Sequence, residues 1–302
     1  MPRQLPMTWP NGARIVVLPQ LIFEGWVGQE AETRTIPKIP HDQLRNGAVD
    51  YNVKAWADYG SNVGAKRVFA LFQKYGIAAT GIFSGAAVER YPDFCKAWVG
   101  AGNEIAAHSY AQDIRIFPLS VDEERANARR CIDVIEQVTG QRPVGWNCPA
   151  GQRSINTTRI LLEEGFYYSY DYKDDDRPHT AEVIDGRRMI AVPKLFDVND
   201  VTNYSLSAHP PSVYVETFCR SFDVLYEEGE TEPKMLSLSA HAAMYGRPFG
   251  VSAVEECIRY ARSFPDVWFA TGKQVADWWL SHGAEAAADS GEGEGGEAGV
   301  RG

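Results

Sequence analysis

The sequence of 302 residues predicts an α/β fold, a distorted (β/α) barrel of seven to eight mostly parallel strands. Two observations support this prediction. Apolar runs of strand length alternate with amphipathic helical segments, and several of these runs end on polar residues. Hydrophobic residues make up 44% of the chain, which is enough for one large core. We therefore expect a single barrel domain over residues 1–282.

The expected elements follow one another from end to end of this domain. The strands cover residues 14–23, 78–83, 103–107, 143–147, 166–170, 189–193, 234–241 and 267–269. The helices cover residues 65–75, 86–91, 92–100, 120–139, 154–164, 212–228, 252–262 and 271–280. Ser120 with Glu123, and Ser252 with Glu255, match the capping box that begins a helix.

Two segments do not fit the alternation of strands and helices. Residues 28–62 are rich in Pro, Gly and charge and lack a helical period, so we expect a long surface excursion there, of the kind that is often functional. Residues 283–302 hold seven Gly, five acidic residues and no aromatic residue. This composition predicts a disordered acidic tail that takes no part in the fold.

Composition excludes several classes of function. A net charge of −10, without clustered Lys and Arg, disfavours nucleic acid and anionic membrane as partners. The chain has no apolar run of about 18 residues and no signal-peptide block at its start, so we expect a soluble, cytoplasmic protein. Its five cysteines are scattered without a Cys-x-x-Cys pair, which argues against a disulfide framework and a thiolate zinc site.

Polar side chains follow several of the predicted strands. Glu24, His108 and His241 each come at or just beyond the end of an apolar run, and Trp146 ends another, with Arg153 soon after it. The carboxyl ends of parallel strands carry the chemistry of α/β barrels. A carboxylate, two imidazoles, a guanidinium and an aromatic ring together indicate a hydrolytic site with a base, an acid, an oxyanion donor and a stacking surface.

With these residues the chain resembles the NodB-homology polysaccharide deacetylases of carbohydrate esterase family 4. It is most similar to their metal-independent allantoinase and cyclic-imide hydrolase branch. The resemblance covers residues 8–280 and rests on an ordered set of motifs: Trp9–Ile15, Glu24, Asp58–Ser61, Glu104–Ser109, Arg142–Trp146, Gly151–Arg153, Val192–Pro193, Asp197–Asp200, Leu236–His241 and Gly246–Pro248. It implies the barrel fold and an amidohydrolase-type enzyme that acts on a non-peptide carbon–nitrogen bond.

The departures from the metal-dependent members concern their metal ligands. Those members carry Asp-Asp after the first strand and a His-Ser-x-x-His pair after the third. This chain has Glu24-Gly25 and His108 with Gln112 at those positions. One of the three family ligands remains, and a divalent ion needs about three good ones, so we expect no catalytic metal. A rebuilt zinc site of Glu24, His108 and His241 stays open as an alternative.

The resemblance suggests ring-opening of a small cyclic amide, ureide or imide, as in an allantoinase. In this hypothesis Glu24 activates water, His108 and Arg153 hold the carbonyl oxygen, and His241 protonates the departing nitrogen. Trp146 is expected to stack on the ring of the substrate.

Tyr110 and Cys148 complete the expected binding residues, and several alternatives remain. Tyr110 and Trp146 could belong to the core or the rim, and Cys148 could be a thiolate nucleophile. The protein could instead be a metal-dependent N-deacetylase of an acetylated sugar or small amide, or a binding barrel without catalysis. The expected partners are a small-molecule substrate and further copies of the chain, in a homodimer or homotetramer.

Overall fold

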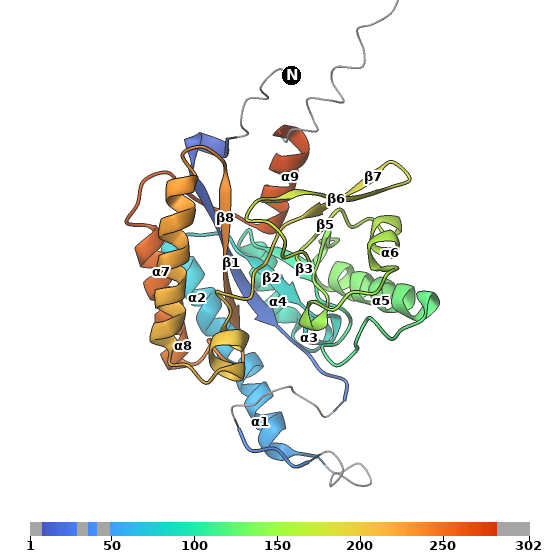
Figure 1. Ribbon diagram of the computed structural model, residues 1–302. Helices are drawn as coiled ribbons and strands as arrows, with labels where there is room; N and C mark the ends of the chain where they lie inside the picture. Colours follow the sequence, from blue (N-terminus) through green and yellow to red (C-terminus); the bar gives the residue numbers. More distant parts are fainter. Residues whose placement is uncertain (1–7, 29–35, 41–48, 283–302) are drawn as a thin grey trace, which may run out of the picture.

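The computed structural model describes residues 8–28, 36–40 and 49–282, and these residues form a half-barrel of mostly parallel strands surrounded by helices (Figure 1). The strands are β1 Ile15–Phe23, β2 Thr80–Phe83, β3 Glu104–Ala107, β4 Gly145–Trp146, β5 Tyr168–Ser169, β6 His179–Ile184, β7 Arg187–Ala191, β8 Lys234–His241 and β9 Val267–Phe269. Their order in the sheet is β6-β7-β5-β4-β3-β2-β1-β8, and β9 pairs with the first half of β1. The predicted distorted barrel is confirmed.

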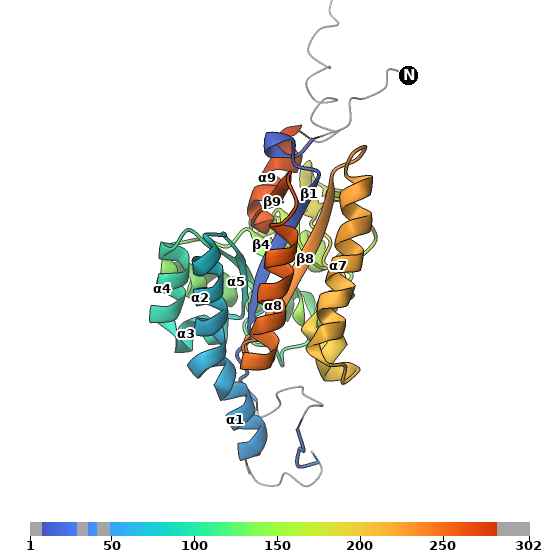
Figure 2. The ribbon, with the colours of Figure 1, turned by 90° about the vertical axis from the view of Figure 1, so that its left-hand side faces the viewer.

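Most of the helices cover the outer face of the curved sheet. The helices are α1 Tyr51–Tyr59, α2 Ala65–Tyr75, α3 Gly85–Arg90, α4 Pro92–Gly100, α5 Val121–Thr139, α6 Thr157–Glu163, α7 Pro211–Glu228, α8 Pro248–Ala261 and α9 Gly272–His282. Of these, α9 packs on the inner apolar cluster, and α1 projects from one end (Figure 1). Figure 2 shows α2, α8 and α7 side by side along β1 and β8, while α9 lies near the end where β1 begins. The capping box that begins α5 is present as predicted, with Ser120 and Glu123 bonded reciprocally.

Side chains of the strands alternate between two apolar clusters. In β1, Leu21 and Phe23 belong to the cluster that includes the outer helices, while Leu18 and Ile22 face the inside of the half-barrel. Successive strand residues point to opposite faces, so Glu24, two residues after Ile22, continues the inner row. The same alternation selects which residues of the other strands reach the interior.

The predicted excursion over residues 28–62 is wrong for its described last part, which is helical. Asp50 caps α1 by accepting from the backbone N–H groups of Asn52 and Val53, and the helix then buries Val53 and Trp56. A π-helical turn, Gly60–Gly64, joins α1 to α2. The short apolar face and the surrounding polar residues hid this helix from the periodicity pattern.

Two further predictions are corrected. Strand β6 was not expected. It pairs with β7 as an antiparallel hairpin whose turn is Asp185-Gly186, both at positive φ, and Asp-Gly favours this kind of turn. The second predicted capping box is also wrong, because α8 begins at Pro248, which suits the first helical turn, and this places Ser252 inside the helix.

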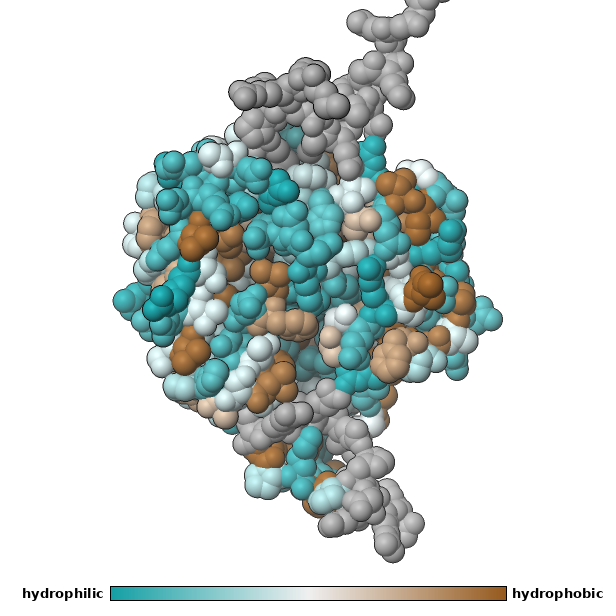
Figure 3. Space-filling model, in the orientation of Figure 1, coloured by the Kyte–Doolittle hydropathy of each residue, from teal (hydrophilic) through white to brown (hydrophobic). Residues whose placement is uncertain are grey.

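Some predictions lie beyond what the structure describes. The tail at 283–302 lies outside the described residues, as do residues 29–35 and 41–48. Among the described helices, none combines the length and apolarity that crossing a bilayer requires. The hydrophobic residues on the face seen in Figure 3 are interspersed among hydrophilic ones, so this face does not identify a dimer contact. The dimer or tetramer stays a prediction.

Candidate active site

Strand register brings Glu24, His108 and His241 to one level. Phe23 pairs with Phe83, and Phe83 pairs with Ala107, so the residues after them leave β1 and β3 together. On the other side of β1, His241 pairs with Ile22. All three polar side chains occupy inward-facing positions of the half-barrel.

The carboxylate of Glu24 lies between the two imidazoles. Its Oε1 is 3.9 Å from His108 Nε2 and 3.8 Å from His241 Nε2. All three side chains are buried, and the most exposed of them, Glu24, is 11% exposed. Both distances are longer than a hydrogen-bond distance, so the carboxylate lies close to both rings without a hydrogen bond to either.

The ring of His108 is fixed from its far side. Its Nδ1 lies 2.6 Å from the carbonyl oxygen of Asn147, which requires a proton on Nδ1. The chain then turns sharply, because Ser109 has a φ of 58° in the left-handed region. Asn127 Oδ1 holds this turn by accepting from Ser109 Oγ and Tyr110 N at 3.1 Å. Backbone strain of this kind clusters at functional sites.

The ring of His241 is held by a buried carboxylate. Its Nδ1 is 2.6 Å from Asp200 Oδ1, while Asp200 Oδ2 accepts from the backbone N–H groups of His241 and Tyr245. Asp200 is fully buried. This pair fixes the proton on Nδ1 and stabilises the imidazolium form, as a carboxylate does for the histidine of a catalytic triad.

The pKa values of the base and the acid move in opposite directions. Burial alone would raise the pKa of Glu24, but contact with His108 and the charges of His241 and Lys194 outweigh burial and lower it. Burial would lower the pKa of His241, but Asp200 and Glu24 outweigh it and raise it. A carboxylate whose pKa is lowered, beside an imidazole whose pKa is raised, suits a general base paired with a general acid.

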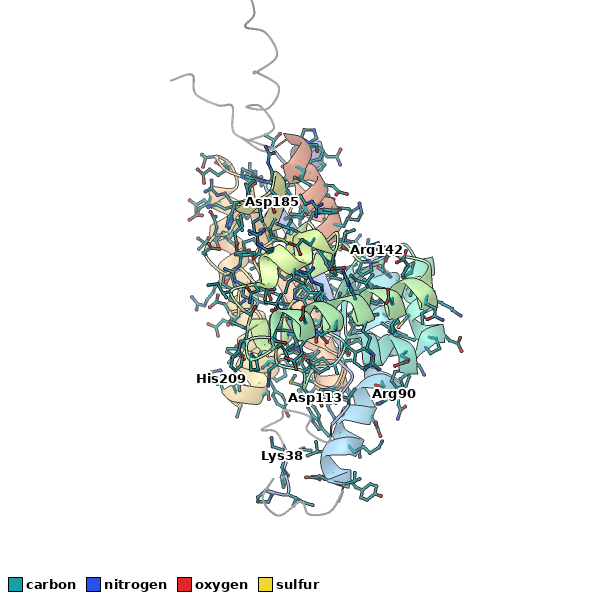
Figure 4. The ribbon with its side chains drawn as sticks, turned by 90° about the vertical axis from the view of Figure 1, so that its right-hand side faces the viewer. Lys38, Arg90, Asp113, Arg142, Asp185 and His209 are labelled. Atoms are coloured by element: carbon teal, nitrogen blue, oxygen red, sulfur yellow. The ribbon has the colours of Figure 1, made fainter. Side chains whose placement is uncertain are left out.

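These groups line a pocket of about 110 Å³ at the carboxyl ends of the strands. Trp26 Nε1 and Gln112 Oε1, both buried in its wall, have no hydrogen-bond partner among the described residues. A second hollow of about 240 Å³ shares Glu24 and Trp26 and is bordered by α1 and Arg90. Figure 4 shows Arg90 and Asp113 at the end of the molecule from which α1 projects.

Arg153 does not reach this pocket. Its guanidinium donates to Glu182 Oε1 and Tyr172 Oη at 2.9 Å and packs over the Tyr172 ring. Glu182 belongs to β6, the strand that the sequence did not reveal, and this unexpected partner draws the arginine away. The expectation that Arg153 holds the carbonyl oxygen is not supported by its position.

Two aromatic residues also lie elsewhere. Trp146 is one residue before the inward position, so it packs against Phe166 in the helix-side cluster, and Asn147 lines the pocket instead. Tyr110 is turned away by the bend at Ser109, and its hydroxyl donates to Glu89 at 2.6 Å. Neither ring borders the pocket that holds Glu24.

Cys148 does line the pocket, as expected. Its Sγ accepts from Trp146 Nε1 at 3.1 Å, and the thiol is fully buried. Burial first, and then the charge of Asp171, raise the pKa of this thiol well above its usual range. The neutral thiol is therefore a wall of the pocket, and the environment opposes the nucleophile alternative.

The local structure does not fit the family's three-ligand metal set. A Cβ built on Gly25 would lie 2.6 Å from the backbone nitrogen of Ala87 and 2.9 Å from the carbonyl carbon of Ala86. A carboxylate at position 25 would require α3 to move. Gln112 replaces the second imidazole, and the described residues contain no group of three or more His, Cys, Asp or Glu placed to hold a metal ion.

Sequence reasoning missed Lys194, and it gave Asp200 no role. Asp200 lies in a quoted family motif, and the apolar run that ends on His241 could have prompted a search for an acidic partner. Lys194, 7% exposed in the pocket wall, is the third residue after β7 and directly follows the strand that the sequence predicts at 189–193. Its position at a strand end, like that of Glu24, was the available signal.

Comparison with known proteins gives a consistent result. The family model for polysaccharide deacetylase matches residues 55–169. The crystal structure of a probable polysaccharide deacetylase from Pseudomonas aeruginosa PAO1 is 31% identical, with a TM-score of 0.83, and covers 93% of this chain and 98% of its own. That of PuuE allantoinase is 30% identical, with a TM-score of 0.81 and the same coverage. A peptidoglycan deacetylase of Helicobacter pylori is 24% identical over 253 residues, 74% of this chain and 85% of its own.

Proposed function

Because the chain belongs to the polysaccharide deacetylase family and is a hydrolase of the amidase type, we propose that it opens the ring of a small cyclic amide, ureide or imide. The observation that carries this proposal is the Glu24 carboxylate held 3.8–3.9 Å from two oriented imidazoles. PuuE allantoinase, by its name a ring-opening enzyme, supports the choice of substrate class.

The proposed reaction uses Glu24 as base and His241 as acid. Glu24 takes a proton from water while the water oxygen bonds to the carbonyl carbon of the ring. The carbon–nitrogen bond then breaks, and His241 gives its Nε2 proton to the departing nitrogen. Transfer of the Glu24 proton to His241 restores the starting charges. His108, anchored by the Asn147 carbonyl, orients the carboxylate.

The size and lining of the pocket favour a small planar ligand. About 110 Å³ is well below the roughly 300–1,000 Å³ that drug-sized ligands occupy. The buried Trp26 N–H and Gln112 carbonyl find no partner in the described parts of the chain, and they match the carbonyl and N–H groups of an amide or imide ring. A polymer would have to use the wider hollow beside α1 as well.

A second candidate is N-deacetylation of an acetylated sugar or small amide. The Helicobacter pylori relative, named a peptidoglycan deacetylase, favours it. The family's metal-dependent route is opposed by Gly25 and Gln112. The third alternative, a binding barrel without catalysis, leaves the opposed pKa directions of Glu24 and His241 without a purpose.

The test is turnover of a panel of cyclic amides: allantoin, hydantoin, dihydrouracil, succinimide and glutarimide. N-acetylglucosamine, whose amide bond is not part of a ring, is the comparison. Loss of ring-amide absorbance reports ring opening, and released acetate reports deacetylation. Turnover of any ring above the rate of the Glu24→Gln variant supports the proposal. Acetate release without ring opening selects deacetylation, and binding without any turnover selects the non-catalytic barrel.

A further inference from the structure

Lys194 places a buried positive charge in the wall of the pocket that holds Glu24. Its side chain is enclosed near the carboxyl ends of the strands, and its backbone N–H donates to the Tyr172 carbonyl. Among the described residues, no hydrogen bond or ion pair is found for the Lys194 ammonium, and its Nζ is not one of the fully enclosed polar atoms, so the ammonium reaches the space of the pocket. The three N–H donors of this ammonium are therefore free to meet a ligand.

An ammonium in the wall of a nearly closed pocket, without a hydrogen bond to the described residues, is costly. Removing such an ion from water costs several kcal/mol even after the protein relaxes. Burial and the nearby charge of Lys173 lower the pKa of Lys194 to about 8, while the charges of Asp200, Glu24 and Asp171 partly restore it. A methionine would fill the same space without this cost, so the fold alone does not require a lysine here.

The reaction needs a group that neither Glu24 nor His241 provides. When water attacks a carbonyl carbon, the carbonyl oxygen takes up negative charge, and donors aimed at that oxygen lower the barrier. The sequence suggested His108 and Arg153 for this role. Arg153 is engaged by Glu182 outside the pocket, and the proposed reaction instead uses His108, anchored by the Asn147 carbonyl, to orient Glu24. Lys194 lines the same pocket as the base and the acid.

We propose that the Lys194 ammonium binds the carbonyl oxygen of the bond to be broken and stabilises its negative charge during water attack. This inference rests on the proposed function. The electrons of the carbonyl π bond move to the oxygen as the new carbon–oxygen bond forms, and they return as the carbon–nitrogen bond breaks. Lys194 keeps its proton throughout, so the proton accounting of Glu24 and His241 is unchanged.

Lys173 offers a matched control in the same pocket. It is also a lysine with a lowered pKa, again caused mainly by burial. Its ammonium, however, donates to the Asp171 carbonyl at 3.1 Å and lies 4.8 Å from the centre of the Phe196 ring. Lys173 already has partners, so its loss should disturb the pocket without removing the oxyanion donor.

The first arm of the test measures turnover of whichever ring the wild type opens. We expect Lys194→Met to lower kcat by about 100-fold or more, the size of effect that removal of an oxyanion donor has, and Lys173→Met to lower it less than tenfold. Lys194→Met should also melt at or above the wild-type temperature, because it removes a buried charge. A Lys194→Met enzyme within fivefold of the wild-type kcat would overturn the assignment.

The second arm needs no turnover. N-carbamoylglycine, the carboxylate formed by opening hydantoin, is titrated against each variant while intrinsic tryptophan fluorescence, to which the pocket residues Trp26 and Trp56 contribute, is followed. Lys194→Met should weaken its binding more than tenfold, and Lys173→Met less than threefold. Equal binding by wild type and Lys194→Met, or no binding by the wild type, contradicts the assignment. Binding that depends on Lys194, without turnover of any ring, would overturn the ring-opening proposal. It would keep Lys194 as a hydrogen-bond donor to a bound anion.

Discussion

Two clusters of buried polar side chains lie inside the half-barrel, one at each end of the strands. We define the closed cluster as Glu104, Thr80, Tyr168 and Tyr170. We define the open cluster as Glu24, His108, His241, Asp200 and Lys194. In the closed cluster, Glu104 Oε1 accepts from Tyr168, and Oε2 accepts from Thr80 and from the backbone N–H of Lys273 in α9, at 2.5–3.0 Å. In the open cluster, Glu24 Oε1 lies 3.9 Å from His108 Nε2 and 3.8 Å from His241 Nε2, both longer than a hydrogen bond.

The two carboxylates differ in pKa because their neighbours differ in charge. Burial raises the pKa of Glu104, and its uncharged donors only partly offset that. Burial acts on Glu24 too, but charged neighbours reverse its effect. Hydrogen bonds from neutral partners hold a carboxyl group in place, whereas nearby cations keep it ionised. The closed cluster therefore anchors α9, and the open cluster is prepared for chemistry.

Exchanging each glutamate for its amide gives the largest contrast. We expect Glu24→Gln to lower kcat for ring opening by about 10³-fold, since general-base catalysis contributes about 10²–10⁴-fold, and Glu104→Gln to leave kcat within threefold. The measurement is the initial rate for both variants at equal folded concentration. Similar losses of kcat in the two variants would mean that the closed cluster is as important for catalysis as the open cluster.

Asp200 is the next point at which the open cluster can be broken. In Asp200→Asn the side-chain oxygen must still serve the two backbone N–H groups, so the amide nitrogen faces His241 and the pKa of the imidazole falls. We expect kcat to drop by about 10²-fold. The alkaline limb of the pH–rate profile should also move to lower pH, because His241 loses its proton sooner. An unchanged limb would remove His241 from the role of acid.

Gly25 tests whether a metal ligand can be rebuilt beside the open cluster. Gly25→Ala should lower the free energy of unfolding by about 1–3 kcal/mol, since its Cβ meets the backbone that begins α3. Gly25→Asp with Gln112→His should be less stable still and bind zinc no more tightly than the wild type. Urea denaturation and a zinc titration measure these effects, and a stable, zinc-binding double variant would refute this reading of position 25.

The closed cluster predicts a pH effect on stability. Because the pKa of Glu104 is raised, the folded protein holds this proton more tightly than the unfolded chain. The resulting stabilisation is present below pH 4.5 and is lost as pH rises through the folded-state value. Unfolding free energies between pH 4 and pH 8 should show wild type losing stability relative to Glu104→Gln as the pH rises. A pH-independent difference between the two proteins would contradict this origin.

Arg153 supplies the smallest expected effect. Its partly exposed ion pair with Glu182 contributes about 0–1 kcal/mol, so Arg153→Ala should change stability little. Its kcat and KM should stay within threefold of wild type, because the guanidinium lies outside the pocket. A loss of kcat above tenfold would restore the role in oxyanion binding that its sequence position suggested.

How much the sequence predicted depended on strand alternation. Glu24, His108 and His241 could be placed together because each ends a strand, and strand ends meet at one edge of a parallel sheet. Trp146 was misplaced by a single residue, since its strand is only two residues long and offers no alternation to follow. Ile22 in β1 faces inward. Once β4 is aligned with β3, the same alternation of side chains makes Asn147 the inward residue of β4, but that alignment requires knowledge of the strand register.

The remaining site residues depend on contacts that no local pattern encodes. Arg153 was captured by a partner 29 residues away. Lys194 lies after β7, and only the folding of β7 beside β5 brings it to Glu24. The left-handed turn at Ser109 directs Tyr110 away from the pocket. It contains no glycine, the residue that usually indicates such a turn in a sequence. The Asp185-Gly186 pair is typical of a hairpin turn and could have indicated the hairpin of β6 and β7.

One measurement tests most directly whether the open cluster does the chemistry with its own side chains. The ring substrate that the wild type opens is assayed before and after exhaustive chelation, with Glu24→Gln as the blank. We predict an unchanged rate after chelation, all of it dependent on Glu24. A rate that vanishes with the chelator and returns with added zinc would contradict this, and would mean that the Glu24, His108 and His241 group holds a metal ion.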